Sequence, residues 1–103
     1  MDEEIINRVW QLAHAVPNYD PDVWRKDFAG AWINREQYGL HSNFGWEIDH
    51  KYPRSLGGGN EISNLMPIHW HNNITKGNDY PRFKTSVSSD GNYNIRKEQN
   101  WKL

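Results

Sequence analysis

The sequence predicts an α+β fold, and three patterns support this class. Residues 3–16 carry apolar side chains at helical spacing, with Asp2 positioned to cap the start and Pro17 to end the helix. The segments 31–33 and 45–50 are short β-branched or aromatic runs typical of strands. Near the C-terminus, alternating residues flank an Asp-Gly pair that is typical of hairpin turns.

The remaining elements follow from local turn and cap signals. A second short helix is expected from Asp20 to about Phe28, because an Asx cap precedes a proline at the first helical position. The glycines of 57–60 force a loop, residues 65–68 are expected to be extended, and a helix is expected over 69–76, ended by Gly77. The middle of the chain is therefore predicted to run strand, loop, strand, helix.

The C-terminal hairpin is expected to pair residues 83–87 with residues 93–96 around Asp90-Gly91. Aromatic side chains are expected to anchor the core, because six Trp, five Tyr and three Phe accompany a hydrophobic content of 36% and a mean hydropathy of −1.00. The candidate core anchors are Trp46, Leu65 and Trp70. At 103 residues the chain is expected to form one domain, residues 1–103.

Composition narrows the classes of function. No apolar run is long enough to span a bilayer, and the acidic start lacks the order of a secretory signal, so a cytoplasmic protein without membrane contact is expected. Cysteine is absent, which excludes disulfides and zinc sites built on paired thiolates.

The net charge gives no general attraction to nucleic acid. Twelve Lys and Arg stand against thirteen Asp and Glu, for a formal charge of −1. The acidic residues dominate positions 2–27, whereas basic residues recur in the second half of the chain: Lys51, Arg54, Lys76, Arg82, Lys84, Arg96 and Lys97. A local basic face is therefore compatible with the sequence.

The most informative segment is 45–81, GWEIDHKYPRSLGGGNEISNLMPIHWHNNITKGNDYP. Asp49 and His50 end a predicted strand. Asn64 lies 14 residues after His50, and Asn73 lies 23 residues after it. A carboxylate oxygen suits Mg²⁺ or Mn²⁺. Adjacent strand residues point to opposite sides, so Asp49 and His50 need a local distortion or separate partners in order to cooperate. Taken alone, an Asp-His pair is more often a solvated turn or a structural pair than a catalytic one.

This segment resembles the HNH family of ββα-metal nucleases in its WEIDH strand, its PRSLGGGNEISNL loop and its HWHNNITKGNDYP helix start. The preceding VPNYDPDVWRKDFAGAWINREQYG is also similar to the region before the motif in small HNH proteins, so the resemblance covers residues 9–95. It implies a ββα-metal (His-Me finger) core at 45–81 with N-terminal helices and a C-terminal β-hairpin. A small cysteine-free protein of phage or bacterial type is expected, in the cytoplasm of a bacterium or of a phage-infected host cell.

The resemblance also implies roles for individual residues. Asp49 and Asn73 would hold the metal, His50 would act as general base, and Asn64 would tie the loop in place and orient His50. Some family members use a third ligand, which here would be His69, with a phosphate contact as its alternative role. The expected cofactor is a divalent metal, Mg²⁺ first and Mn²⁺ as the alternative. Structural zinc is not expected, because the cysteine pairs that hold it in other members are missing.

The partner implied by the resemblance is DNA. Lys51, Arg54 and Lys76 are expected to contact phosphates, which positions the strand without reading its sequence. Three functions stay open at this point: a metal-dependent DNA endonuclease, a nuclease toxin with an immunity partner, and a non-catalytic nucleic-acid-binding module. The sequence does not distinguish DNA from RNA as substrate, single- from double-strand cleavage, or a monomer from a homodimer.

Overall fold

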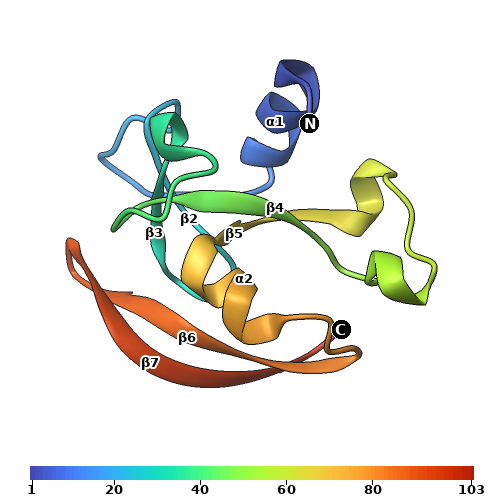
Figure 1. The fold of residues 1–103 in the computed structure, drawn as a ribbon. Coiled ribbons are helices and arrows are strands. Elements are labelled where there is room, and N and C mark those ends of the chain that lie inside the picture. Colours follow the sequence, from blue (N-terminus) through green and yellow to red (C-terminus); the bar gives the residue numbers. More distant parts are fainter.

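A computed structural model describes all residues from Met1 to Leu103. It contains two helices and three antiparallel sheets, which confirms the predicted α+β class (Figure 1). The elements are α1 (Glu3–Trp10), β1 (His14–Ala15), β2 (Trp24–Lys26), β3 (Trp32–Asn34), β4 (Trp46–His50), β5 (Leu65–His69), α2 (Trp70–Lys76), β6 (Arg82–Asp90) and β7 (Tyr93–Lys102). Neither helix has the length and apolar character needed to cross a membrane.

The N-terminal helix is shorter than the sequence predicts. Asp2 caps it as expected, accepting a hydrogen bond from Ile5 N at 2.9 Å, but α1 ends at Trp10. The buried guanidinium of Arg25 explains the early end, because it donates to the carbonyl oxygens of Gln11 and Ala13. These carbonyls would otherwise accept hydrogen bonds from the next helical turn. The chain turns instead and continues into β1.

The expected helix from Asp20 to Phe28 is wrong. Asp20 and Pro21 form a turn in which the Asp20 carbonyl accepts from Val23 N and Trp24 N, and the chain then enters β2. This strand pairs with β1 and with β3. Trp24 packs edge-on against Trp32, with ring centroids 6.2 Å apart. Aromatic packing and strand pairing with distant residues thus outweigh the local cap signal.

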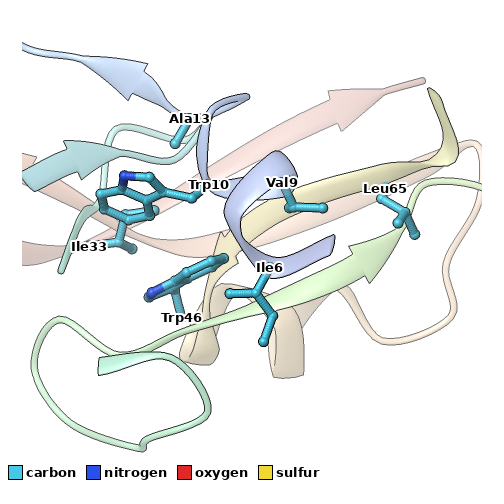
Figure 2. Close-up of a cluster of buried hydrophobic side chains, with 7 residues drawn as sticks. All are labelled: Ile6, Val9, Trp10, Ala13, Ile33, Trp46 and Leu65. Carbon is cyan, nitrogen blue, oxygen red and sulfur yellow. The ribbon is translucent and has the colours of Figure 1, made fainter. Parts of the chain in front are cut away.

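The predicted order of strand, loop, strand and helix is confirmed for β4, β5 and α2. β4 and β5 are antiparallel, with Asp49 opposite Met66 and His50 opposite Leu65. One apolar cluster joins β4 and β5 to α1 and β3, and Figure 2 shows Trp10 and Trp46 close together within it. Their ring centroids are 5.2 Å apart. The cluster comprises Ile6, Val9, Trp10, Ala13, Ile33, Trp46 and Leu65. Trp46 and Leu65 are core residues as predicted, whereas Trp70 is only half-buried.

The C-terminal hairpin is confirmed and is longer than expected, with β6 and β7 turning at Gly91. Gly91 has a φ of 57°, which favours glycine. α2 lies across β6 (Figure 1). The hairpin also returns to the first sheet, because the Asn94 side chain bonds both the N–H and the carbonyl of Trp32, and Gln99 Nε2 donates to Ala29 O. Contacts between residues 62 and 70 positions apart therefore close the fold.

A buried carboxylate connects the three sheets. Asp27 Oδ1 accepts from Ala29 N and Ala31 N, and its Oδ2 accepts from His69 N and Asn72 Nδ2, all at 2.9–3.0 Å. Asn72 is itself fully buried, and its Oδ1 accepts from Ser86 N and Val87 N of β6. The pair Asp27 and Asn72 therefore links the β2–β3 turn to the β5–α2 junction and to β6.

Asp27→Asn should destabilise the protein. Each carboxylate oxygen of Asp27 accepts two hydrogen bonds, so an NH₂ group in place of either oxygen would face two donors. We expect the free energy of unfolding to fall by about 2–4 kcal/mol in urea denaturation at neutral pH. Asp22→Asn is the matched control, since Asp22 is exposed and should change stability little. Equal stability of the two variants would contradict this account of Asp27.

The same variant gives a pH test. Burial raises the pKa of Asp27 above its ordinary value of 3.8, against hydrogen bonds from His69, Asn72 and Ala31 that lower it. Between 3.8 and the raised pKa the native state binds more protons than the unfolded state, so stability from this residue rises as the pH falls. The stability difference between wild type and Asp27→Asn should widen on acidification through that range, and a narrowing difference would be the contrary result.

Candidate functional site

A pocket of about 390 Å³ lies between β4 and α2. Four of the residues expected to form the site line it, namely Asp49, His50, Arg54 and Asn73. They reach the pocket from three elements, because β4 supplies the acid and the histidine, α2 supplies the asparagine, and the turn after β4 supplies the arginine. The pocket thus joins an acid, a base and an amide at one surface, although Asp49 and His50 are neighbours on one strand.

Asp49 is the most strongly perturbed group of this pocket. Its side chain is 13% exposed, and its Oδ2 lies 3.0 Å from Lys76 Nζ. Burial raises the pKa of Asp49, while the Lys76 ammonium and His50 lower it. Oδ2 is buried and makes no hydrogen bond besides this ion pair. The carboxylate therefore has one charged partner and spare capacity to bind another cation.

Lys76 requires a correction to the expected phosphate contacts. Its side chain is 0% exposed, and its ammonium pairs with Asp49 and packs 5.2 Å from the ring of Phe83. Helical periodicity explains the position, because Lys76 lies four residues after the buried Asn72 and shares its inward face. A lysine in this position cannot meet a phosphate on the surface without leaving its pair.

The ring of His50 is held by a residue that the sequence analysis did not single out. His50 Nε2 lies 2.7 Å from Asn60 Oδ1, in the loop between β4 and β5. An amide oxygen only accepts, so Nε2 is the donor in this contact. The only sequence signal for this contact is that Asn60 follows three glycines, which allow the loop to fold back on the strand end.

Asn64 fastens the same loop from its other end. Its Oδ1 accepts from Tyr52 N at 2.8 Å, and its Nδ2 donates to the carbonyls of Tyr52 and Gly59. Its backbone carbonyl accepts from Lys51 N, directly after His50. Asn64 makes no hydrogen bond to the imidazole, whose partner is Asn60. Its influence on His50 therefore runs through the backbone of the loop.

The amide of Asn73 is oriented by Glu47. Asn73 Nδ2 donates to Glu47 Oε2 at 3.1 Å, and Asn73 Oδ1 makes no hydrogen bond. Glu47 lies two residues before Asp49, on the same face of β4. This period-two spacing is the signal by which Glu47 could have been found in the sequence. The result is an amide whose oxygen remains available.

His69 requires a second correction, because it does not line this pocket. It ends β5 opposite Trp46, three positions away from the pair Asp49 and Met66. Both of its ring nitrogens are engaged, since Nε2 donates to Asn43 O and Nδ1 accepts from His71 N. Burial lowers the pKa of His69, which favours the neutral ring. Its position before the helix, where it caps α2, explains why helical spacing to Asn73 was misleading.

Of the three basic residues expected to meet DNA, only Arg54 lines the pocket. Arg54 is exposed and makes no ion pair. Lys51 lines a different, mostly apolar pocket beside Leu12 and Phe83. The guanidinium of Arg54 is therefore a positive charge that lines the pocket and takes part in no ion pair.

The oxygen donors of the pocket fit a hard divalent cation. Asn73 has an amide oxygen without a hydrogen-bond donor, and the carboxylate of Asp49 has the Lys76 ammonium as its one charged side-chain partner. No group of three His, Cys, Asp or Glu side chains is arranged to hold a metal, so two protein oxygens would be completed by water and substrate. Mg²⁺ is commonly bound in this way, through one or two protein ligands plus waters and phosphate oxygens. The Lys76 ammonium opposes the binding of a cation through charge repulsion.

Comparison with known proteins gives a match in this region. Residues 39–79 match the sequence model of a family described as HNH endonuclease. The matched segment contains β4, β5, α2 and the loop that Asn64 fastens. No curated protein and no solved structure matches the chain. The resemblance drawn from residues 45–81 is thereby confirmed at the level of the family.

Lys76→Met should expose the conflict between the ammonium and a metal at Asp49. Removal of one member of a buried pair costs about 3 kcal/mol, so the variant should be less stable than wild type in chelator. Mn²⁺ should then raise its thermal midpoint more than it raises that of wild type, because the uncompensated carboxylate binds cations more tightly. Calorimetry with and without Mn²⁺ measures both effects.

The matched control for this variant is Lys84→Met. Lys84 also pairs with an acid, Glu98 at 3.6 Å, but both side chains are more than half exposed. Such a surface pair contributes little to stability. The control should keep the wild-type midpoint and the wild-type response to Mn²⁺. An identical response of Lys76→Met and wild type would rule out competition between Lys76 and the metal.

Proposed function

We propose, from the HNH endonuclease domain that the chain carries at residues 39–79, that this protein is a metal-dependent endonuclease that hydrolyses phosphodiester bonds in DNA. The observation that carries the proposal is the meeting of Asp49, His50 and Asn73 in one open pocket within the matched segment. HNH nucleases act on DNA and generally use a divalent metal. Hydrolysis of a phosphodiester requires a base for water and positive charge near the phosphate, and these residues supply or hold both.

His50 is the proposed general base. Because Asn60 fixes the proton on Nε2, the lone pair of Nδ1 is available to take a proton from the attacking water. The ring is half-buried at the pocket wall, where water and substrate can reach it. Asn64 acts indirectly in this scheme, since it holds the loop that carries Asn60.

Asp49 and Asn73 are the proposed metal ligands, with Mg²⁺ the expected ion and Mn²⁺ the alternative. When bound, the ion would supply Lewis-acid charge stabilisation for the phosphate and the leaving oxygen. Glu47 keeps the oxygen of Asn73 free by accepting from its Nδ2. Arg54 is the proposed phosphate contact, because its unpaired guanidinium lines the same pocket.

A non-catalytic nucleic-acid-binding domain is the second candidate. One observation favours it: the ammonium of Lys76 already neutralises Asp49, the only carboxylate that lines the pocket. A protein that had lost metal binding could keep its fold with such a pair. The two candidates differ in whether purified protein cuts DNA.

Nicking of supercoiled plasmid in Mg²⁺, Mn²⁺ or chelator distinguishes them. We expect metal-dependent nicking by wild type, with a loss of about 10²–10⁴-fold in His50→Ala because proton transfer is removed. Asn73→Ala should reduce nicking and require more metal. His14→Ala and Asn100→Ala are the matched controls, since both residues are exposed and lie outside the pocket. Absence of nicking by wild type in every metal would favour the second candidate.

A separate prediction concerns Asn60 as a positioning residue. Asn60→Ala frees the ring of His50 and should lower kcat about tenfold with little change in stability, because Asn60 is exposed. Asn60→Asp keeps an acceptor for Nε2 and should restore activity in part, with the pH profile displaced to higher pH because an added carboxylate favours the charged imidazole. Equal activity in all three proteins would remove Asn60 from the mechanism.

A further inference from the structure

A second pocket of about 320 Å³ lies at the Trp70 end of α2, between the loop before β4 and the C-terminal hairpin. Its walls come from parts of the chain far apart in sequence. The residues that matter here are His41, Asn43, Trp70, His71, Asn94 and Arg96. Asn73 of α2 and Gly77, which follows its last residue, line the first pocket, and neither lines the second. The two pockets are therefore distinct sites on the same helix.

Trp70 forms a fixed platform on this surface. Its Nε1 donates to Ser42 O, and the ring of His41 stacks on it with centroids 4.4 Å apart and planes 13° from parallel. The Asn94 amide donates to Asn43 O, which ties the loop to the hairpin across the pocket. The walls are thus held by hydrogen bonds and stacking, and a ligand would meet a preformed surface.

Arg96 is the one formally charged side chain among the residues that line this pocket, which also include three histidines. One of these is His71. Burial and, as a smaller cause, the guanidinium of Arg96 lower the pKa of His71. No carboxylate lines the pocket. Arg96 takes part in no ion pair, and Glu98, two residues further along β7, is paired with Lys84. Glu47 does not line the pocket but lies 3.5 Å from His41, which does. A guanidinium and an imidazole that line one pocket are suited to share an anion.

The position of the second pocket relative to the first indicates which kind of anion it would bind. An α-helix rises 1.5 Å per residue, so Trp70 lies about 5 Å along the axis from Asn73 and about 10 Å from Gly77. Successive nucleotides of one strand advance about 3.4 Å along a duplex axis. The exposed face between the pockets carries Ile74, which is 60% exposed and uncharged. One strand can therefore cross α2 and reach both pockets within a few nucleotides.

We propose that the pocket formed by Trp70, His71 and Arg96 binds a backbone phosphate of the nucleic-acid strand, a few nucleotides from the bond that is cut. The identity of the polymer rests on the proposed function, whereas the anion site rests on the residues of the pocket. Arg96 supplies the charge, and His71, whose Nδ1 is engaged with Ser86 Oγ, presents its other ring nitrogen. This site gives a near-neutral protein a local contact with DNA.

The test measures binding of a fluorescein-labelled DNA duplex in chelator as the salt concentration is varied. Each lost phosphate contact lowers the slope of log affinity against log salt by about 0.9. Arg96→Ala should bind more weakly with this change in slope, and Arg96→Lys should recover most of the slope. Lys97→Ala is the matched control, since it removes the same charge from the adjacent position, which is exposed and lies outside the pocket.

The outcomes separate this proposal from the proposed function. Equal slopes for Arg96→Ala, Lys97→Ala and wild type overturn the phosphate site, even if wild type nicks plasmid. A slope change confined to Arg96→Ala supports it, even if wild type does not nick. Titration with inorganic phosphate forms the second arm. Binding of free phosphate that depends on Arg96, with no effect of Arg96→Ala on the DNA slope, would identify a site for small phosphates and overturn the role in DNA binding.

Discussion

The buried contact between Asp27 and Asn72 is the interaction on which the rest of the structure depends. A carboxylate without solvent is costly unless its oxygens are satisfied, and here four donors from three segments satisfy them. Asn72 passes the connection on to β6 through three further hydrogen bonds. The helix α2 is only seven residues long and would be marginal alone, so its position is set by these contacts.

The composition of the site follows from this constraint. With Asn72 directed inward, Asn73 faces β4 and Lys76 lies under Asp49. The same carboxylate of Asp27 holds the backbone of His69, which caps the helix and is therefore unavailable to the first pocket. The pocket between β4 and α2 thus contains few charged groups. The carboxylate of Asp49 is already neutralised by the ammonium of Lys76. Binding of a metal would add positive charge to the pair of Asp49 and Lys76.

Much of this arrangement could be predicted from local sequence, and the rest depends on distant contacts. The run 45–50, the glycine loop and the C-terminal Asp-Gly turn identify their elements because hydrophobic period and turn chemistry are local properties. The helix expected over 3–16 ends early because Arg25 captures carbonyls of the chain after Trp10. The inward position of Lys76 and the roles of Asp27, Glu47 and Asn60 are set by partners between 10 and 45 residues away. The hydrophobic periodicity of one segment does not predict contacts with residues so far away in the sequence.

The hydrogen bonds from the C-terminal hairpin to Trp32 and Ala29 have a consequence for the order in which the protein can be made. A ribosome releases β2, β3 and the motif of 45–81 well before it releases Asn94 and Gln99, which complete the first sheet. Pairings of such long sequence separation raise the contact order and delay folding until the distant partner is present. The segment 45–81, which contains Asp49, His50 and Asn73, therefore lacks its final packing partners until β7 has left the ribosome. The pocket between β4 and α2 can thus take its final form only after β7 has been synthesised.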